Sequence, residues 1–256
     1  MEIAIDDIMA MTGDFFWPFL RISALFAVAP VFSARSVPVR VRIILALLIT
    51  LLIQPSLPYL EPIEPLSAIG FLLILQQLGI GIVMGLIMQI VMSALVMAGQ
   101  AIATTMGLGF ASSVDPQNGV QVTMLGQFYL IIGTLYLLAV DGHLLLIDVL
   151  VQSFVSIPVG EPFNAAEIFG NVALFTAELF VAAILIALPV IVGVLLVNLA
   201  FGVVTRAAPQ LNIFAVGFPA TMLAGFVLIL FSIPVLFPTL TSFFAVGFDF
   251  MRTLVN

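Results

Sequence analysis

Charged residues are absent from two long stretches of this chain, and their absence restricts the fold more than any other feature. None occurs between Glu64 and Asp115, and none between Arg206 and Asp249. An apolar helix of about 20 residues crosses the roughly 30 Å hydrocarbon core of a bilayer. A soluble domain with 63% hydrophobic and only 7% charged residues could not cover its apolar surface. We therefore expect an all-α, polytopic integral membrane protein.

Six hydrophobic regions predict the membrane-spanning parts of the chain. They cover residues 15–33, 42–60, 66–103, 122–157, 171–204 and 212–246. The third and fourth are too long for simple straight spans, so each is either one long tilted helix or a helix pair with a break. Asp141 and Gly142 mark the expected break in the fourth. Pro189 and Pro219 lie inside the last two regions, where loss of a helix hydrogen bond favours packing against other helices.

The arginines predict an orientation. Three of the six lie in the 35–42 loop and one in the 205–211 loop, and the chain has no lysine. By the positive-inside rule, six simple spans would place these loops and the 104–121 loop in the cytoplasm, with both termini outside. No basic residue precedes Arg21, which does not fit a secretory signal, so we expect the N-terminal segment to be retained.

Composition also excludes several kinds of site. Cysteine is absent and His143 is the single histidine, so the usual zinc, iron–sulfur and thiol chemistry has no ligands here. We expect no metal and no cofactor. A net charge of −7 and six basic residues give no basic surface for nucleic acid.

The stretch TTMGLGFASSVDPQNGV, residues 104–120, is the least hydrophobic passage in the middle of the chain. It lacks the third glycine of GxGxxG and the GK[ST] of a P-loop, so it is not a phosphate site. Non-helical backbone at membrane depth is tolerated only inside protein or beside a water-filled cavity. The residue types leave two interpretations open, a pore element and an ordinary cytoplasmic turn.

Catalysis by this chain is not favoured. Ser112 or Ser113 with His143 and Asp141 could supply an intramembrane protease, but neither serine stands in a GxSxG motif. A Gly-His pair between helix segments is more often a structural turn.

Two acidic residues raise a different hypothesis. Asp148 and Glu178 lie within apolar stretches, where an ionised carboxylate costs about 2.5–3.5 kcal/mol. Buried acids of this kind often belong to a proton relay or an ion site. An ion-coupled secondary transporter that uses these two acids is therefore the alternative function, although no clear inverted repeat accompanies them.

Three glycines predict a close helix contact. Gly79, Gly81 and Gly85 lie on one helix flank, and small residues spaced in this way let two backbones approach. The contact could be with a helix of this chain or with another subunit.

Three motifs together resemble the FliR family. They are APVFSARSVPVRVRIILALLI (29–49), MGLGFASSVDPQNG (106–119) and DGHLLLIDVLVQSF (141–154). The resemblance covers nearly the whole chain. It implies a non-enzymatic subunit of the flagellar type III protein export gate, in the bacterial inner membrane and the flagellar basal body, with much of the assembly towards the periplasm.

The resemblance also implies a division of the chain. Residues 1–180 are similar in layout to FliP, and residues 181–256 resemble the helical hairpin of FliQ. The expected fold is thus a set of kinked helical hairpins in a hetero-oligomeric helical assembly. FliP-like and FliQ-like subunits, FlhB, FlhA, membrane lipid and unfolded export substrates are the implied partners. Energy would come from an export ATPase and the proton gradient.

Site residues follow from the same resemblance. A plug loop within 104–121 would close the channel, and its residues would be Gly107, Leu108, Gly109, Phe110, Ala111, Ser112, Ser113, Val114, Asp115 and Pro116. The tip of the hairpin would contact FlhB on the cytoplasmic side through Arg206, Pro209, Gln210 and Asn212.

Overall fold

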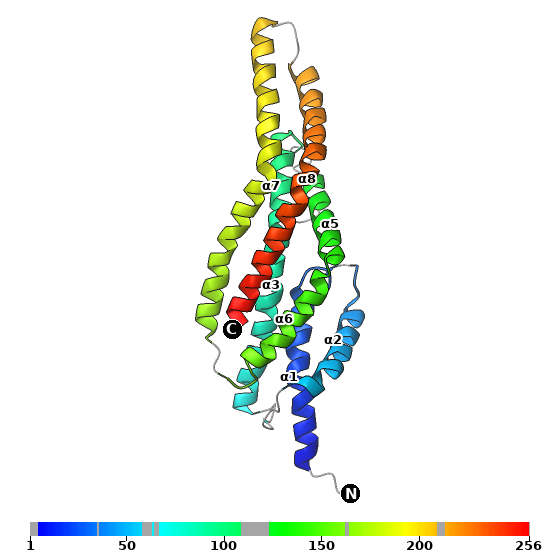
Figure 1. Cartoon of the computed structure of the whole chain (residues 1–256), viewed down its shortest axis with the longest axis vertical. Helices are drawn as coiled ribbons and strands as arrows, with labels where there is room; N and C mark the ends of the chain where they lie inside the picture. Colours follow the sequence, from blue (N-terminus) through cyan, green and yellow to red (C-terminus); the bar gives the residue numbers. More distant parts are fainter. Residues whose placement is uncertain are drawn as a thin grey trace. The chain divides into compact units, whose positions relative to one another are not determined.

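The computed structural model describes residues 5–34, 36–57, 63, 67–108, 123–161, 164–208 and 213–255. All regular structure in these ranges is helical, which confirms the predicted all-α fold (Figure 1). The elements are α1 (Ile5–Val28), α2 (Val39–Ile53), the 3₁₀ turn η1 (Gln54–Ser56), α3 (Ala68–Thr105), α5 (Met124–Ala139), α6 (Gly142–Ser156), α7 (Ala165–Ala207) and α8 (Ile213–Val255).

Several of these helices are long and apolar enough to cross a membrane. Within the described ranges there are four, namely Val39–Ser56, Ala68–Thr105, Ala166–Ala207 and Val216–Leu254, and a fifth if α5 and α6 count as one broken span. The prediction of a polytopic membrane protein is confirmed. The expectation of six spans is wrong, because the apolar part of α1 covers only Phe15–Val28. The predicted region 15–33 starts at the same residue but extends past the helix, because α1 ends at Val28, shortly before Pro30. The orientation in the membrane stays a prediction.

The predicted break at Asp141-Gly142 is confirmed. α5 ends at Ala139 and α6 begins at Gly142, with a bend of 67° between the two helices. Asp141 adopts a left-handed conformation with φ 55°, which ends the first helix. A Cβ at Gly142 would collide with the side chain of Leu137 and lie 3.0 Å from its carbonyl oxygen. The bend therefore requires a residue without a side chain at this position.

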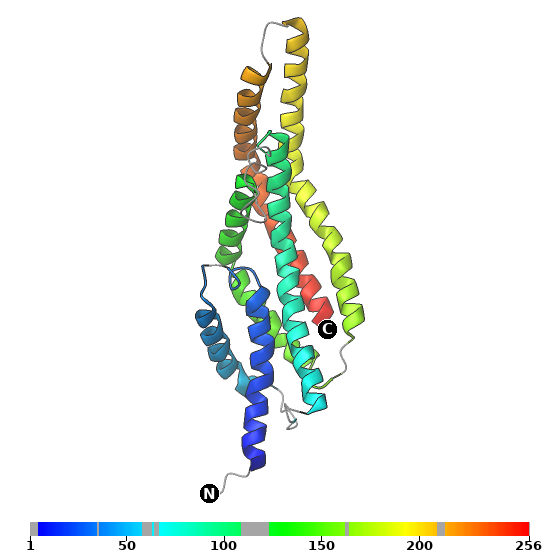
Figure 2. The ribbon, with the colours of Figure 1, turned by 180° about the vertical axis from the view of Figure 1, so that it is seen from behind.

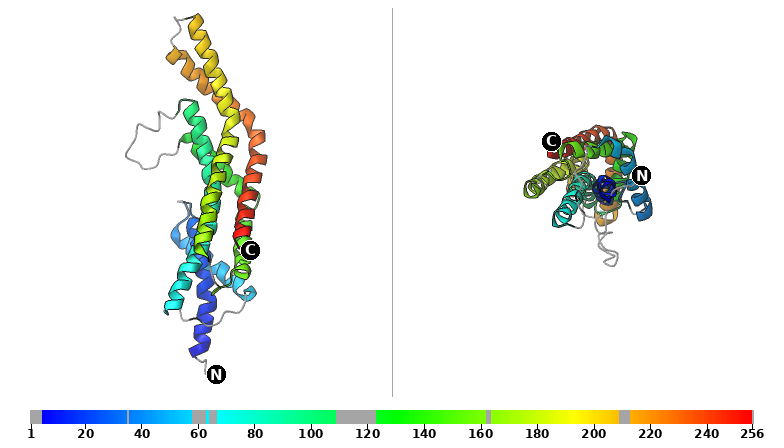
Figure 3. Two further views of the ribbon diagram at one scale, coloured as in Figure 1. Left: turned by 90° about the vertical axis from the view of Figure 1, so that its left-hand side faces the viewer. Right: turned by 90° about the horizontal axis from the view of Figure 1, so that it is seen from below.

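The prolines of α7 and α8 do not end these helices. Pro189 lies inside α7, and Pro219, Pro234 and Pro238 lie inside α8. Between residues 176–207 and 213–244 the two helices run antiparallel, side by side, in every view (Figures 1, 2 and 3). A Cβ at Gly193 of α7 would lie 2.5 Å from a methyl group of Leu228 in α8. Such close packing can compensate for the hydrogen bonds that proline removes.

The chain divides into two compact units. The first comprises residues 1–90, 137–175 and 245–256, and the second comprises 91–136 and 176–244. In the first unit α1 and α2 form an antiparallel hairpin (Figure 1). Trp17, Leu25 and Phe26 of α1 are buried there, and Met92 and Ile102 of α3 are buried in the second unit. The division at residue 180 that the family resemblance implies stays a prediction.

Arg21 is completely buried in the first unit, where neutral oxygen atoms surround its charge. Its four hydrogen bonds run from Nε to Gln77 Oε1 (2.7 Å), from Nη1 to Ser153 O (2.8 Å) and Ser153 Oγ (3.0 Å), and from Nη2 to Ile157 O (2.9 Å). The guanidinium carbon also lies 4.2 Å from the ring centroid of Phe154. Two of these acceptors are carbonyls at the C-terminal end of α6, where the helix dipole concentrates negative charge. The arginine thus joins α1, α3 and α6.

Candidate functional site

α3 ends in a glycine cap at the start of the predicted plug. Gly107 has φ +82°, and its N–H donates to Thr104 O at 3.1 Å. The N–H of Leu108 donates to Ala103 O at 2.8 Å. This pair of bonds is the Schellman motif, in which a left-handed residue just past the helix satisfies its last carbonyls. Gly107 and Leu108 therefore form the C-terminal cap of α3.

Glycine is required at position 107 for two independent reasons. Its positive φ is costly for any residue that carries a Cβ atom. In addition, a Cβ at Gly107 would lie 2.7 Å from Cε2 of Phe218, so the aromatic ring occupies the space of a side chain. The ring of Phe218, from α8, thus lies directly against the backbone where α3 ends.

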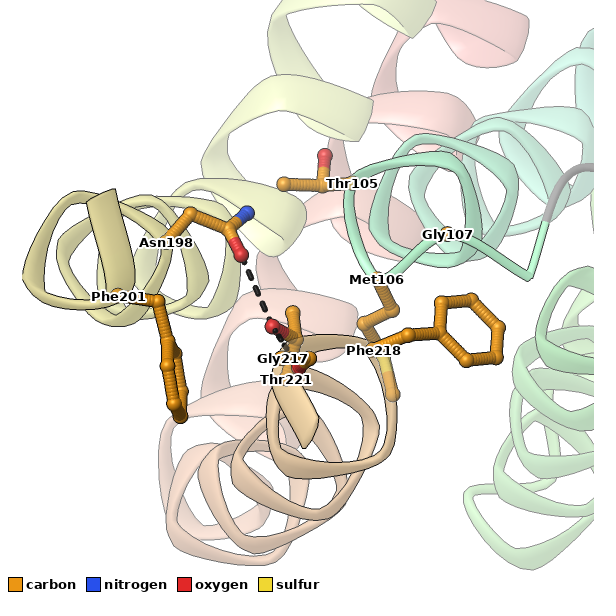
Figure 4. A pocket seen from close by; sticks show the side chains of 8 residues that line it. All are labelled: Thr105, Met106, Gly107, Asn198, Phe201, Gly217, Phe218 and Thr221. Atoms are coloured by element: carbon orange, nitrogen blue, oxygen red, sulfur yellow. Dashed lines mark hydrogen bonds between the residues drawn. The ribbon is translucent and has the colours of Figure 1, made fainter. Parts of the chain in front are cut away.

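A cavity of about 390 Å³ opens beside this cap (Figure 4). Its walls come from residues 105–107 at the end of α3, Asn198 and Phe201 of α7, and Gly217, Phe218 and Thr221 of α8. All of these residues belong to the second unit. The cavity lies at the point where α3 gives way to the predicted plug.

The polar groups of the cavity are held in place by one another. The hydroxyl of Thr221 lies 2.9 Å from Asn198 Oδ1 and 2.9 Å from Gly217 O, and its single proton is shared between these two acceptors. Thr105 Oγ1 donates to Ala101 O at 2.8 Å. The amide nitrogen of Asn198 makes no hydrogen bond within the described part of the chain, and it lies on the side of Thr105 in Figure 4. The cavity therefore offers neutral donors and acceptors beside aromatic rings.

The residues that line this cavity supply no charged group and no metal ligand of the usual kind. None of its lining residues is ionisable. In the part of the chain that the structure describes, no three His, Cys, Asp or Glu side chains gather to hold a metal ion. What the cavity can do is bind, through uncharged hydrogen bonds and apolar contact.

The remaining plug residues, 109–116, lie outside the described residues, as do Pro209, Gln210 and Asn212 of the hairpin tip. Arg206 lies in the last turn of α7 with an exposed side chain. Of the four residues predicted for the tip contact, the structure therefore describes only Arg206.

The three glycines predicted to form a close helix contact, Gly79, Gly81 and Gly85, differ in their surroundings. A Cβ at Gly81 would lie 2.8 Å from the Cβ of Ala24, and one at Gly85 would lie 2.9 Å from the Cβ of Val28. Both contacts are with α1, so these two glycines bring α3 against a helix of the same chain. A Cβ at Gly79 would meet no atom within 4 Å.

The acidic residues are not buried within the chain. Asp148 and Glu178 are exposed, and Asp148 accepts a hydrogen bond of 2.8 Å from Gln152 Nε2. Within the chain by itself neither acid is buried, and the apolar residues one turn earlier on the same helix faces, Leu144 and Leu174, are also exposed. His143 is half-buried in the first turn of α6, and Ser112 and Ser113 lie outside the described residues.

Asn198, Thr221 and Phe201 were not predicted to share a site. A polar residue within the apolar run VLLVNLAFGVV was the available signal for Asn198. Its partner Thr221 lies 23 residues further along the chain, on the antiparallel helix, and no sequence pattern pairs the two.

Comparison with known proteins covers almost the entire chain. Residues 12–246 match the family described as bacterial export proteins, family 1. The flagellar biosynthetic protein FliR of Pectobacterium carotovorum is 38% identical over 250 residues, which cover 98% of this chain and 95% of that protein. FliR of Escherichia coli K12 is 35% identical over 257 residues, with 100% and 98% covered. FliR of Bacillus subtilis 168 is 34% identical over 246 residues, with 93% and 92% covered. The chain therefore belongs to the FliR family of bacterial export proteins.

Proposed function

We propose that the chain is a non-enzymatic subunit of the flagellar type III protein export gate, located in the bacterial inner membrane and the flagellar basal body. The observation that carries this proposal is the extent of the similarity. Relatives that are named flagellar biosynthetic proteins match at least 93% of the chain at 34–38% identity. The several helices long enough to cross a membrane agree with that location.

The segment 107–116 would act as the plug of the channel. The cap at Gly107 and Leu108 supports this role, because it ends α3 abruptly and frees the chain that follows from the helix. Leu108, Phe110 and Val114 would supply an apolar seal, since a hydrophobic constriction closes a pore by excluding water. The small residues between them would let an unfolded polypeptide pass once the segment moves.

FliP-like and FliQ-like subunits, FlhB and FlhA would be the partners, with the FliP-like part in residues 1–180 and the FliQ-like hairpin in 181–256. Large uncovered apolar faces support an assembly. Only 11% of the Val39–Ser56 window is buried within the chain. On α7 and α8, Leu199 and Phe231 are 66% and 77% exposed. Lipid or other subunits must cover such surfaces.

The alternative of an ion-coupled transporter gains no support from the acids on which it rests. Asp148 and Glu178 are exposed rather than enclosed in a cavity. A working ion site at membrane depth would face the interior of the bundle or a water-filled space.

Cysteine crosslinking tests the plug, because the chain has no cysteine of its own. In the assembled gate, Phe110→Cys should crosslink to an export substrate that is stalled in the channel. Ile44→Cys, on an exposed face of α2, is the control and should give no such crosslink.

The opposite result would count against the proposal. If the thiol at position 110 reacts freely from the cytoplasm in the closed gate and captures no substrate, the segment is an ordinary turn. Deletion of 108–114 provides a second measurement. We expect the complex to assemble and to leak ions, whereas a loss of assembly would mean that the segment has a structural role.

A further inference from the structure

The cavity beside Gly107 has the size of a binding site. Its volume of about 390 Å³ falls in the range of roughly 300–1,000 Å³ that is typical of ligand pockets. Two other cavities in the described part of the chain measure only about 10 Å³ each, which is the scale of a packing defect. The cavity beside Gly107 is therefore large enough for a side chain together with part of a backbone.

The hydrogen-bonding groups of the cavity form a complementary pair. Asn198 Oδ1 is engaged by the hydroxyl of Thr221, which leaves the amide nitrogen of Asn198 as a donor. The proton of Thr105 Oγ1 is engaged by Ala101 O, which leaves the lone pairs of that oxygen as acceptors. The site thus presents one oriented donor and one oriented acceptor, and both are neutral.

Apolar groups complete the walls. Phe201 and Phe218 provide aromatic rings, and Met106 provides a flexible thioether. An ionic ligand would lose its hydration and gain no countercharge, because no lining residue is ionisable. A peptide group has one donor and one acceptor and is flanked by side chains, so it matches this set of groups.

We propose that this cavity binds one peptide group and an adjacent apolar side chain of an extended, uncharged segment of polypeptide. The inference rests on the proposed function, which supplies unfolded chains as the occupant. Recognition through the main chain is independent of sequence, because every residue except proline carries the same donor and acceptor. A bound segment would lie against Gly107 and would therefore contact the residue that caps α3.

A photocrosslinking experiment in the assembled gate tests the inference. We replace Phe201 with p-benzoylphenylalanine and, in a separate variant, Leu199, which lies on α7 outside the cavity and is 66% exposed. A stalled export substrate should crosslink at position 201 and not at position 199. A crosslink from position 201 to lipid or to another gate subunit alone would overturn the inference.

Substitution of the donor provides the matched comparison. In the crosslinker background, Asn198→Leu should lower the substrate yield about three- to tenfold, the effect of one lost neutral hydrogen bond. Thr221→Val, which keeps the shape but releases the orientation of Asn198, should lower the yield less. Asn171→Leu, on α7 outside the cavity, is the control and should leave the yield unchanged. An unchanged yield in Asn198→Leu, in a gate that still assembles, would refute the role of the amide.

The proposed export function and the proposed peptide-binding cavity can be refuted independently of each other. If a substrate crosslinks at position 110 but not at 201, the export function stands and the cavity assignment falls. If it crosslinks at neither position, both fall.

Discussion

Replacing Arg21 with methionine should destabilise the first unit substantially. The change removes the four hydrogen bonds that join α1 to α3 and α6. Methionine fills the space of the arginine side chain as far as Nε, so the loss combines the polar contacts with a small void where the rest of the guanidinium lay. The acceptors that remain must then stay buried without a donor, and this determines the size of the effect.

The structure identifies which acceptors lose their partner. Ser153 O still accepts the N–H of Ile157 at 3.0 Å, so its carbonyl stays satisfied. Within the described residues Gln77 Oε1 and Ile157 O accept from no other donor; a buried unsatisfied group such as Gln77 Oε1 costs about 1–3 kcal/mol, and the half-buried Ile157 O costs less. The substitution also removes the buried positive charge of Arg21 together with its desolvation penalty, and this offsets part of the cost. We expect a net loss of about 2–4 kcal/mol, which corresponds to a fall in Tm of about 5–15 °C for a chain of this size.

Trp17 provides the assay. It is the only tryptophan, it is buried, and it lies one helical turn before Arg21 on α1. Its fluorescence during thermal unfolding of the full chain in detergent reports directly on this packing. Arg40→Met is the matched control, because Arg40 is exposed and has no recorded partner in the described residues, and its Tm should stay within about 2 °C of the wild type.

A double mutant sharpens the test. Gln77→Leu in the Arg21→Met background removes the orphaned oxygen and also Gln77 Nε2, which is buried and has no partner among the described residues. The double mutant should be more stable than the sum of the single effects by about 1–3 kcal/mol. Additive effects, or an Arg21→Met protein that melts with the wild type, would refute the reasoning.

Two further pairs of variants are informative in the same assay. Gly81→Ala should destabilise by about 1–3 kcal/mol, because its Cβ would lie 2.8 Å from that of Ala24, whereas Gly79→Ala meets no atom and should gain up to about 1 kcal/mol of helix propensity. Equal Tm values for these two variants would contradict the packing described here. Asp141→Gly should stabilise by about 0.5–1 kcal/mol, because φ 55° suits glycine, and Asp141→Val should destabilise by about 1–2 kcal/mol. If valine is tolerated as well as aspartate, the left-handed turn does not govern the break.

Local features were predictable from the sequence, and distant pairings were not. The break at Asp141-Gly142 was predicted because a charged residue followed by glycine interrupts an apolar run. The first region was predicted to span because hydropathy alone does not show that α1 ends at Val28, five residues before the end of the apolar run. Gly81 was predicted to touch a helix, but only the structure identifies that helix as α1.

The candidate site illustrates the same limit. In the sequence Gly107 is only part of a GxG pattern. Its structural role depends on two backbone hydrogen bonds and on the ring of Phe218, 111 positions away in the chain. Asn198 and Thr221 meet because α7 and α8 are antiparallel at one particular register. A register between two apolar helices has no signature in hydropathy.

The partners of Arg21 have a consequence for the time course of synthesis. Gln77 follows Arg21 by 56 residues, and Ser153 follows it by 132. At roughly 5–20 residues per second, the ribosome reaches the first acceptor after about 3–11 s and the second after about 7–26 s. Throughout that interval the guanidinium must remain hydrated, because an arginine in an apolar environment without acceptors is costly. The full set of acceptors around this charge in the first helix is thus complete only after α6 has been made.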